Sequence, residues 1–519
     1  MNPIKEVKFG KDAKEPLING VNVVCDAVSS TMGYRGRTML IEDGGGKPSP
    51  TKDGVSVAKA IFLDNPNESL GAEFVKEACN KTVNQAGDGT TSTAVLTQEF
   101  VKLSQHAISM NASPIDLKNE IESAKDEVIE YLKHNSVEVD DEYIKDVAKI
   151  SSNNDEELGS IIAEAFLKAG KNGVVSYEDS DTSTTYVESI NGMPIDRGYD
   201  IEFFNNVPEK RCVEFKDNPY VLLSNRNIQS LQDILPILEF TNKEKKPILI
   251  VSEMEHQVLK TLYTNTKKGL LKVAVISPPA VAEKRMDYLS DIALATNAMV
   301  LDIDTGDNIA SYDPRQLLGV CSSLTVTKDN TILFFDEMIN AEAIDKRMTD
   351  LNKVIENSHS DLEKKYLGDR VAKLSCGVSV VKVGASTESE LKEKTDRVDD
   401  AIHAVRAALA EGVVEGGGTA LVNASRILSE EKEGYRLVKE AILAPFKTIL
   451  ANAGVEYSEI LPMVSEKLGY DVKEYRLCNM IESGIIDPVK VVRCALENSV
   501  SAANTLLMTN GTITFKRSN

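Results

Sequence analysis

Long apolar runs are missing from this chain of 519 residues, because no stretch of about 18 consecutive apolar residues occurs. A membrane-spanning helix needs a run of that length, so none is expected. The first six residues also lack the apolar core of a signal peptide. We therefore expect a cytoplasmic protein that does not associate with membranes.

Positive charge is also scarce. Lysine and arginine number 59 against 80 aspartates and glutamates, which gives a formal net charge of −21 and a pI near 4.9. Such a surface repels the phosphates of nucleic acids and the headgroups of anionic membranes. Neither is expected as a partner. The length of the chain predicts two to four domains.

Histidine and cysteine are few and scattered. The five histidines lie apart from one another and from the seven cysteines, an odd number without any CxxC pair. A zinc site and a Cys–His nucleophile therefore have little support, and free thiols in a reducing compartment fit best. His403 is expected to be an exposed residue of a helix.

The most informative segment that is present is Gly87-Asp88-Gly89-Thr90-Thr91-Ser92-Thr93. Apolar residues at helical spacing stop at Gly87 and resume after Thr93, which places the segment at a helix N-terminus. Free backbone N–H groups attract anions there, and glycine lets the backbone approach a phosphate closely. Because an aspartate would repel a phosphate, Asp88 suits a Mg²⁺ ligand. The alternative is that Asp88 only caps the helix.

Helical patterns at both ends of the chain enclose a region of a different kind. Residues 12–135 and 411–510 carry alanine, leucine and valine at spacings of three and four. Between them, short apolar strands at residues 220–223, 248–251 and 273–276 alternate with amphipathic helices. The predicted fold class is multidomain α and α/β, with an α/β domain inserted into a mostly helical one.

The chain resembles the group I chaperonins of the GroEL type over nearly its whole length. Among the matching segments are Val7-Lys8-Phe9-Gly10, Thr51-Lys52-Asp53-Gly54, Gly87 to Thr93, Asp196-Arg197-Gly198-Tyr199, Arg397 to Arg406, Gly412 to Gly418 and Gly484 to Pro488. Many motifs in one order make the resemblance specific. Departures from the usual motifs suggest a divergent member, such as one encoded by a bacteriophage.

The resemblance implies three domains. A mostly helical equatorial domain would comprise residues 1–134 and 411–519, and a small α/β intermediate domain residues 135–191 and 377–410. The α/β apical domain would comprise residues 192–376. Gly192 and Gly377 would be hinges between the intermediate and apical domains, and ordinary loop glycines are the alternative.

The resemblance also implies a site for ATP and Mg²⁺. Asp88 would bind Mg²⁺, and Asp53 and Asp400 would position the attacking water. Asp400 would reach the phosphates only when the intermediate domain closes, so that hydrolysis is gated by closure. The other ATP-binding positions are Thr31, Met32, Gly33, Tyr34, Lys52, Gly89, Thr90, Thr91, Ser92, Gly417, Asp471 and Asp487, the last of which would hold the ribose. Tyr34 and Asp471 depart from the family's usual residues.

Two helices of the inserted domain carry more apolar residues than one packed face needs. Ile237 and Phe240 lie off the main stripe of the first helix, so surplus apolar surface could face outward. A wide core stripe is the alternative. The resemblance implies that unfolded polypeptides bind at Tyr199, Phe203, Phe204, Leu235, Leu238, Leu259 and Tyr263. A GroES-type co-chaperonin would use the same surface.

The two ends of the chain read as short strands, and residues 37–41 begin a hairpin around Gly44-Gly45-Gly46. In the family, that hairpin pairs with the termini of the neighbouring subunit, and repetition of this contact closes a ring. The resemblance implies a homo-oligomer of seven subunits per ring, in one or two rings. An ATP-driven folding machine is the main hypothesis. A holdase or assembly scaffold with weak ATP turnover is the alternative. A small-molecule enzyme has little support, because the sequence shows no constellation of residues around a nucleophile.

Overall fold

The computed structural model describes residues 5–42, 46, 48–152, 155–169, 174–180, 182–199, 204, 206–207, 212–225, 227–280, 283–302, 312–328, 330–335, 340–358, 360–375 and 377–515. The chain forms two compact units. Unit 1 comprises Met1–Ala163, Asp179–Tyr186 and Val383–Asn519, and unit 2 comprises Glu164–Glu178 and Val187–Lys382. The helical and α/β fold class is confirmed, whereas the bounds of three separate domains stay a prediction.

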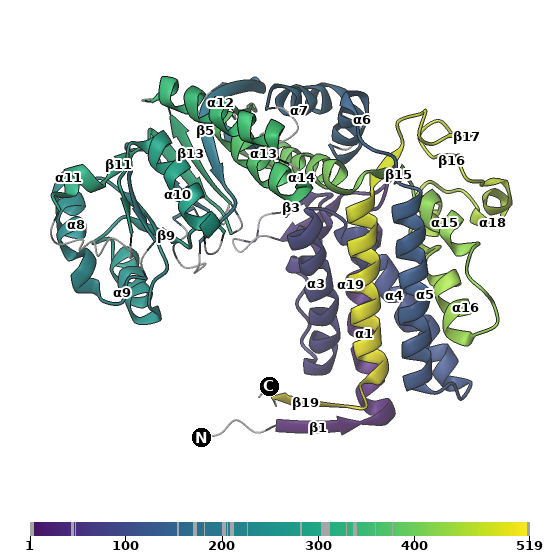
Figure 1. Cartoon of the computed structure of the whole chain (residues 1–519). Coiled ribbons are helices and arrows are strands. Elements are labelled where there is room, and N and C mark those ends of the chain that lie inside the picture. The colour runs from purple at the N-terminus through teal and green to yellow at the C-terminus, as the bar shows by residue number, and fades with distance from the viewer. Residues whose placement is uncertain are drawn as a thin grey trace. The chain divides into compact units, whose positions relative to one another are not determined.

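Unit 1 is mostly helical (Figure 1). Its first part contains α1 (Gly10–Ser29), α2 (Gly54–Ala60), α3 (Pro66–Ala86), α4 (Thr90–Ser109), α5 (Pro114–His134) and α6 (Asp141–Ser151). Its last part contains α14 (Glu388–Glu411), α15 (Thr419–Ser425), α16 (Glu433–Ala441), α17 (Ala444–Asn452), α18 (Tyr457–Ile460), the 3₁₀ turn Leu461–Met463 and α19 (Val489–Met508). Helix α7 (Glu156–Ala169) runs from unit 1 into unit 2.

Helices α1, α3, α4, α5 and α19 pack side by side around one apolar core (Figure 1). Two glycines let α1 and α3 come very close. A Cβ on Gly20 would lie 1.9 Å from the carbonyl oxygen of Glu68, and a Cβ on Gly71 would lie 1.9 Å from that of Leu17. Because α1 and α3 end just before residues 31–34 and 87–89, this crossing fixes where those two segments lie.

The described residues of unit 1 also form four pairs of short antiparallel strands. They are β1 (Lys5–Phe9) with β19 (Gly511–Phe515), β2 (Met39–Glu42) with β3 (Pro48–Thr51), β15 (Val413–Glu415) with β18 (Ile486–Pro488), and β16 (Leu468–Asp471) with β17 (Arg476–Asn479). The predicted terminal strands and hairpin are thus confirmed. Gly44 and Gly45 lie outside the described residues.

The described part of unit 2 contains two sheets. Strands β7 (Tyr220–Ser224), β8 (Ile248–Val251) and β9 (Val273–Ile276) are parallel and carry β10 (Val300–Leu301) and β11 (Gly319–Val320) beside β7. The other sheet has the order β4 (Val174–Asp179), β14 (Gly377–Val383), β5 (Tyr186–Ile195), β13 (Thr331–Phe335), β12 (Ser323–Val326) and β6 (Val213–Phe215). The remaining helices are α8 (Leu231–Glu244), α9 (His256–Lys267), α10 (Glu283–Thr296), α11 (Pro314–Leu317), α12 (Ala341–Asn357) and α13 (Asp361–Ser375).

The predicted hinge glycines do not lie in loops. Gly192 lies inside β5 opposite Phe334, and Gly377 begins β14. A Cβ on Gly192 would lie 2.4 Å from a methyl group of Val378, so close strand packing explains the glycine at this position. The loop alternative is therefore wrong, and a hinge role stays a prediction.

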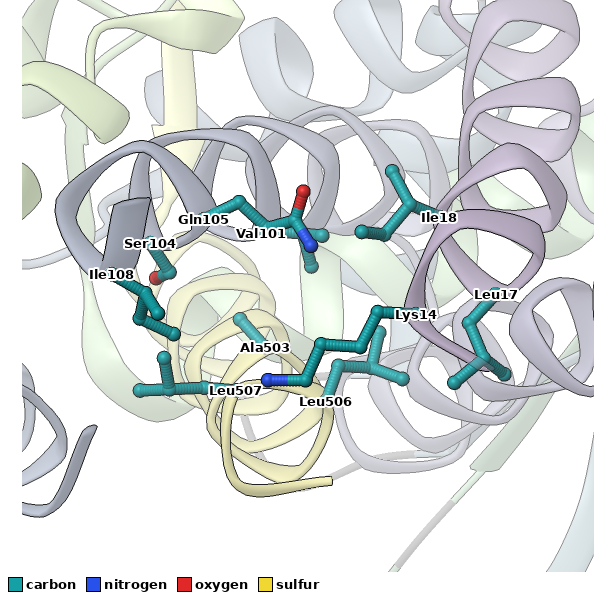
Figure 2. A pocket seen from close by; sticks show the side chains of 10 residues that line it. All are labelled: Lys14, Leu17, Ile18, Val101, Ser104, Gln105, Ile108, Ala503, Leu506 and Leu507. Carbon is teal, nitrogen blue, oxygen red and sulfur yellow. The ribbon is translucent and has the colours of Figure 1, made fainter. Parts of the chain in front are cut away.

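A small cavity lies between α1, α4 and α19 (Figure 2). Its volume is about 20 Å³, which is room for a water molecule or two. The hydroxyl of the buried Ser104 lines it and has no hydrogen-bond partner among the described residues. A water molecule there would satisfy Ser104. The cavity lies toward the C-terminal end of α4, about 20 Å along the helix from the phosphate-binding segment predicted at its N-terminus.

Among the described residues, we find no helix with both the length and the apolar character needed to span a bilayer.

Candidate nucleotide site

The segment from Gly87 to Thr93 links α3 to α4 through two left-handed glycines. Gly87 ends α3 with φ 79° and Gly89 precedes α4 with φ 99°, conformations that favour glycine. The buried hydroxyl of Thr93 donates to the carbonyl of Gly89 at 2.9 Å, which holds the turn in place. The segment therefore lies at the N-terminus of a 20-residue helix, as the sequence predicts, and the binding of an anion by the amides there stays a prediction.

The turn that carries Asp53 lies against the same helix end. Both carboxylate oxygens of Asp53 cap α2, accepting from the N–H groups of Val55 at 2.9 Å and Ser56 at 2.8 Å. A Cβ on Gly54 would lie 2.6 Å from the hydroxyl of Thr91, so this turn touches the first turn of α4. The carboxylate of Asp53 is thereby fixed in direction beside the anion site.

Three further carboxylates gather there. Burial raises the pKa of Asp88, and the neighbouring Asp53 raises it further. Burial also raises the pKa of Asp400 well above its ordinary value, with added contributions from Asp88 and Asp53. Burial and the charge of Asp88 raise the pKa of Asp487 to about 7, although the N–H of Gly417 donates to it. Segments far apart in the sequence therefore bring four aspartates together.

This arrangement fits a divalent cation. Among the described residues, the largest influences on the pKa values of Asp88, Asp400 and Asp487 include no lysine or arginine. Clustered carboxylates without such partners favour protonation or a bound cation. No group of three His, Cys, Asp or Glu side chains in the described part of the chain forms a ready-made metal cage. Mg²⁺ suits such a site because it binds through one or two carboxylates plus water and phosphate oxygens.

Helix α14 positions Asp400. Its last turns pack on α3 and α19 through the apolar cluster Ala86, Ala407, Val491 and Cys494. We expected Asp400 to approach the phosphate loop only after a domain movement, and in this structure it already lies within electrostatic reach of Asp53 and Asp88. In this structure α14 thus packs against the candidate site.

Gly417 and Asp487 form another wall of the site. Gly417 follows β15 with φ 64°, and Asp487 lies on the paired strand β18 opposite Val414. A Cβ on Gly417 would lie 3.3 Å from the terminal methyl of Met480, so the Met480 side chain packs closely against this glycine. The structure brings both residues to the Asp88 side of the site, as the sequence predicts.

Residues 31–34 follow α1. Thr31 and Met32 are buried, and the Met32 side chain packs with Val95 and Ala444, so it is a core residue. Asn452 donates to the carbonyl of Met32 at 3.0 Å and so anchors this turn. Gly33 has φ 77°.

Tyr34 and Asp471 have partners of their own. The guanidinium of Arg35 lies 5.3 Å from the ring centre of Tyr34 and donates to the carbonyl of Lys473 at 3.1 Å. The carboxylate of Asp471 accepts from the N–H of Lys473 at 2.8 Å and therefore caps the β16–β17 turn. Arg35 thus links Tyr34 to the β16–β17 turn, so the two residues that depart from the family pattern lie in one region. The side chain of Asp471 serves to cap that turn. Their contacts with a nucleotide stay a prediction.

Two features near the site were missed in the sequence. Asp396 lies one helical turn before Asp400, and burial and the charge of Asp53 raise its pKa to about 6. The i, i+4 spacing of these aspartates was the available signal. His403 lies on a helix with its side chain 42% exposed, as expected, but its packing against Gly87 was missed. No pattern in one sequence reveals that contact.

The predicted polypeptide-binding residues lie in unit 2, and most are buried. Leu238, Leu259 and Phe204 belong to its core, as does Tyr199. Leu235 is 42% exposed, Tyr263 is partly buried with its ring 6.3 Å from that of Phe204, and Phe203 lies outside the described residues. Of the two residues off the main stripe of α8, Ile237 is buried, and Phe240 is partly buried with its ring against that of Tyr220. The broad stripes pack on a sheet whose strands β8 and β9 are buried throughout, which favours the core alternative for most of these residues.

Comparison with known proteins supports this fold. A profile of the TCP-1/cpn60 chaperonin family matches residues 24–517. The chaperonin gp146 from the bacteriophage EL 2 (Pseudomonas aeruginosa), crystallised in presence of ATP-BeFx, is 22% identical and matches with a TM-score of 0.75 in crystal form II, covering 98% of this chain and 99% of that chain. Crystal form I of the same protein matches with a TM-score of 0.65 over the same shares. The chain described here belongs to the TCP-1/cpn60 chaperonin family.

Proposed function

We propose that this chain is an ATP-dependent chaperonin whose unit 1 binds and hydrolyses Mg-ATP. The gathering of Asp53, Asp88 and Asp400 at the N-terminus of α4 is the observation that carries this proposal. Phosphoryl transfer needs donors around the phosphate oxygens, a positioned water and a cation. The crystallisation of gp146 with ATP-BeFx supports the same ligand class.

Each residue would have a separate task. The amides at the start of α4 and the hydroxyls of Thr90, Thr91 and Ser92 would hold the phosphates, and Lys52 would add positive charge. Asp88 would bind Mg²⁺, which supplies charge neutralisation when bound. Asp400 would orient the attacking water and accept its proton, because a raised carboxyl pKa suits a general base. Asp53, fixed by its two hydrogen bonds, would orient the same water, and Asp487 would hold the ribose.

Hydrolysis would be coupled to protein folding. Because α14 carries Asp400, the site is complete only when α14 is seated, so that ATP binding would favour the closed conformation. Unfolded polypeptides would bind on α8 and α9, where Leu235 and Tyr263 reach the surface, and movement of these helices would expose the buried members of the predicted set. A GroES-type co-chaperonin would use the same surface.

The terminal ribbon β1–β19 supports assembly into a ring. The register places Val7 opposite Ile513 and Lys5 opposite Phe515, and Val7, Ile513 and Phe515 are 49%, 64% and 56% exposed. Thr512 on the other face is buried and donates to Asn67 at 2.6 Å. The ribbon therefore turns the threonines of β19 inward and exposes Val7, Ile513 and Phe515, and such exposed apolar residues support a subunit contact at this face. A ring of seven subunits, single or double, would follow from the family.

A refolding assay tests the proposal. A chemically denatured, aggregation-prone enzyme is diluted into buffer with the wild-type protein or with Asp400→Ala, each with and without Mg-ATP. We expect recovery of native enzyme only with the wild-type protein and Mg-ATP. An ATP-independent yield would contradict the proposal.

A holdase or assembly scaffold with weak hydrolysis is the second candidate. The use of Asp471 in a turn and the cluster of Tyr34, Arg35 and Lys473 favour it, because these groups replace the expected adenine side of the site. Suppressed aggregation without recovery of native enzyme, with a GroES-type protein added, would identify this function.

A further inference from the structure

His403 lies on α14, three residues after Asp400 and four after Asp399, so that all three side chains lie near one face of the helix. Its Nε2 is 3.4 Å from the Oδ1 of Asp399. The charge of His403 also acts on Asp88 in the phosphate loop and lowers its pKa. The imidazole therefore lies between α14 and the loop that would hold the phosphates.

The contact between His403 and Gly87 leaves no space. A Cβ on Gly87 would lie 2.1 Å from the Cβ of His403, 2.5 Å from its Cγ and 2.8 Å from its Nδ1. Separations under about 3 Å force neighbouring atoms to move. One turn further along α14, Ala407 packs with Ala86. The two contacts together form the seat of α14 on the end of α3.

These two contacts set the distance between α14 and the C-terminal end of α3. Asp400 belongs to the turn of α14 that precedes His403, so a shift at Gly87 moves Asp400 with the helix. A misplacement of about 1 Å in a catalytic group is enough to lower a rate by about 100-fold.

We propose that His403 is a positioning residue. Its contact with Gly87 fixes how closely α14 packs on the end of α3 and thereby holds Asp400 beside Asp53 and Asp88. This inference rests on the proposed ATPase function of the same site. His403 itself touches neither the phosphates nor the attacking water in this account.

The first test compares two alanine substitutions by hydrogen exchange in the nucleotide-free protein. Gly87→Ala adds a methyl group at the contact, whereas the control Gly454→Ala has nearly the same φ, 72° against 79°, and nothing within 4 Å. Both carry the cost of a left-handed alanine. We expect exchange of the α14 amides at residues 398–407 to rise about tenfold or more in Gly87→Ala and to stay unchanged in Gly454→Ala. Equal exchange in the two variants would overturn the proposal.

The second test separates positioning from binding. We expect His403→Ala to lower kcat for ATP by about 10- to 100-fold and to leave the Kd of a non-hydrolysable ATP analogue within about threefold. His403→Gln, which fills similar space and can still donate to Asp399, should retain most of the rate. An unchanged kcat in His403→Ala, or an equal loss of affinity, would overturn the inference.

The two proposals fail in different ways. If the wild-type protein hydrolyses no ATP, the proposed function is wrong. If the wild-type protein hydrolyses ATP and both Gly87→Ala and His403→Ala match it, only the role of His403 is wrong.

Discussion

Gly71→Ala tests the close crossing of α1 and α3. The new Cβ would lie 1.9 Å from the oxygen and 2.7 Å from the carbon of the Leu17 carbonyl, both backbone atoms. Ordinary contact begins at 3.4 Å, so the helices must separate by about 3.4 − 1.9 = 1.5 Å. Overpacking of this kind costs about 1–3 kcal/mol. Alanine regains about 1 kcal/mol of helix propensity, which leaves a net loss of about 1–2 kcal/mol.

Hydrogen exchange of the α1 amides measures this loss locally, which suits a multidomain chain without a single unfolding free energy. Gly368→Ala in α13 is the matched control, because nothing lies within 4 Å of its Cβ position. It should slow exchange in its own helix through the gain in propensity alone. Because the crossing positions residues 31–34 and 87–89, Gly71→Ala should also weaken binding of an ATP analogue. Exchange and affinity equal to those of the wild-type protein would show that the crossing of α1 and α3 tolerates the added methyl group.

Three further outcomes are expected. The pKa of the Asp396 carboxyl is raised to about 6, so this group is neutral in acid and repels Asp53 once it is ionised. The packing of α14 in the nucleotide-free protein should therefore weaken as pH rises through 6. Asp396→Asn should make hydrogen exchange of α14 less dependent on pH, and the same pH dependence in both proteins would contradict this role of Asp396. Leu235→Ser should reduce binding of a denatured protein without changing thermal stability. Leu238→Ala, at a position 4% exposed, should instead destabilise unit 2 by about 2–5 kcal/mol. Destabilisation by Leu235→Ser without a loss of binding would show that the denatured protein does not bind at Leu235. Phe9 is 69% exposed on the terminal ribbon, and Phe9→Ser should dissociate the oligomer, as measured by sedimentation velocity. An oligomer of unchanged size would show that this face does not form the subunit contact.

The sequence predicted the elements of the site because local rules govern them. Glycines at positions 87 and 89 permit the left-handed turns that join α3 to α4, and the hydrogen-bonded aspartate before Gly54 begins α2. The fully apolar strands at residues 248–251 and 273–276 could belong only in a buried sheet. Such features depend on neighbouring residues and can be read without a structure.

Other features depend on which segments meet in space. The contact of His403 with Gly87 joins residues more than 300 positions apart, and the partnership of Arg35 with Lys473 joins residues even further apart. The sequence also does not tell which apolar residues of α8 are buried and which are exposed. Ile237, for example, is buried because of the position of the sheet on which α8 packs. Tertiary packing decides such cases, whereas periodicity alone does not.

In the proposed mechanism, the packing of α14 on α3 places Asp400 where it would activate water for attack on ATP. The most direct measurement is the steady-state rate of Mg-ATP hydrolysis by the wild-type protein and by Asp400→Ala, together with the affinity of each for a non-hydrolysable analogue. We expect a rate lowered by about 100-fold or more in Asp400→Ala, with the affinity within about threefold. An Asp400→Ala protein that hydrolyses ATP at the wild-type rate would contradict this mechanism.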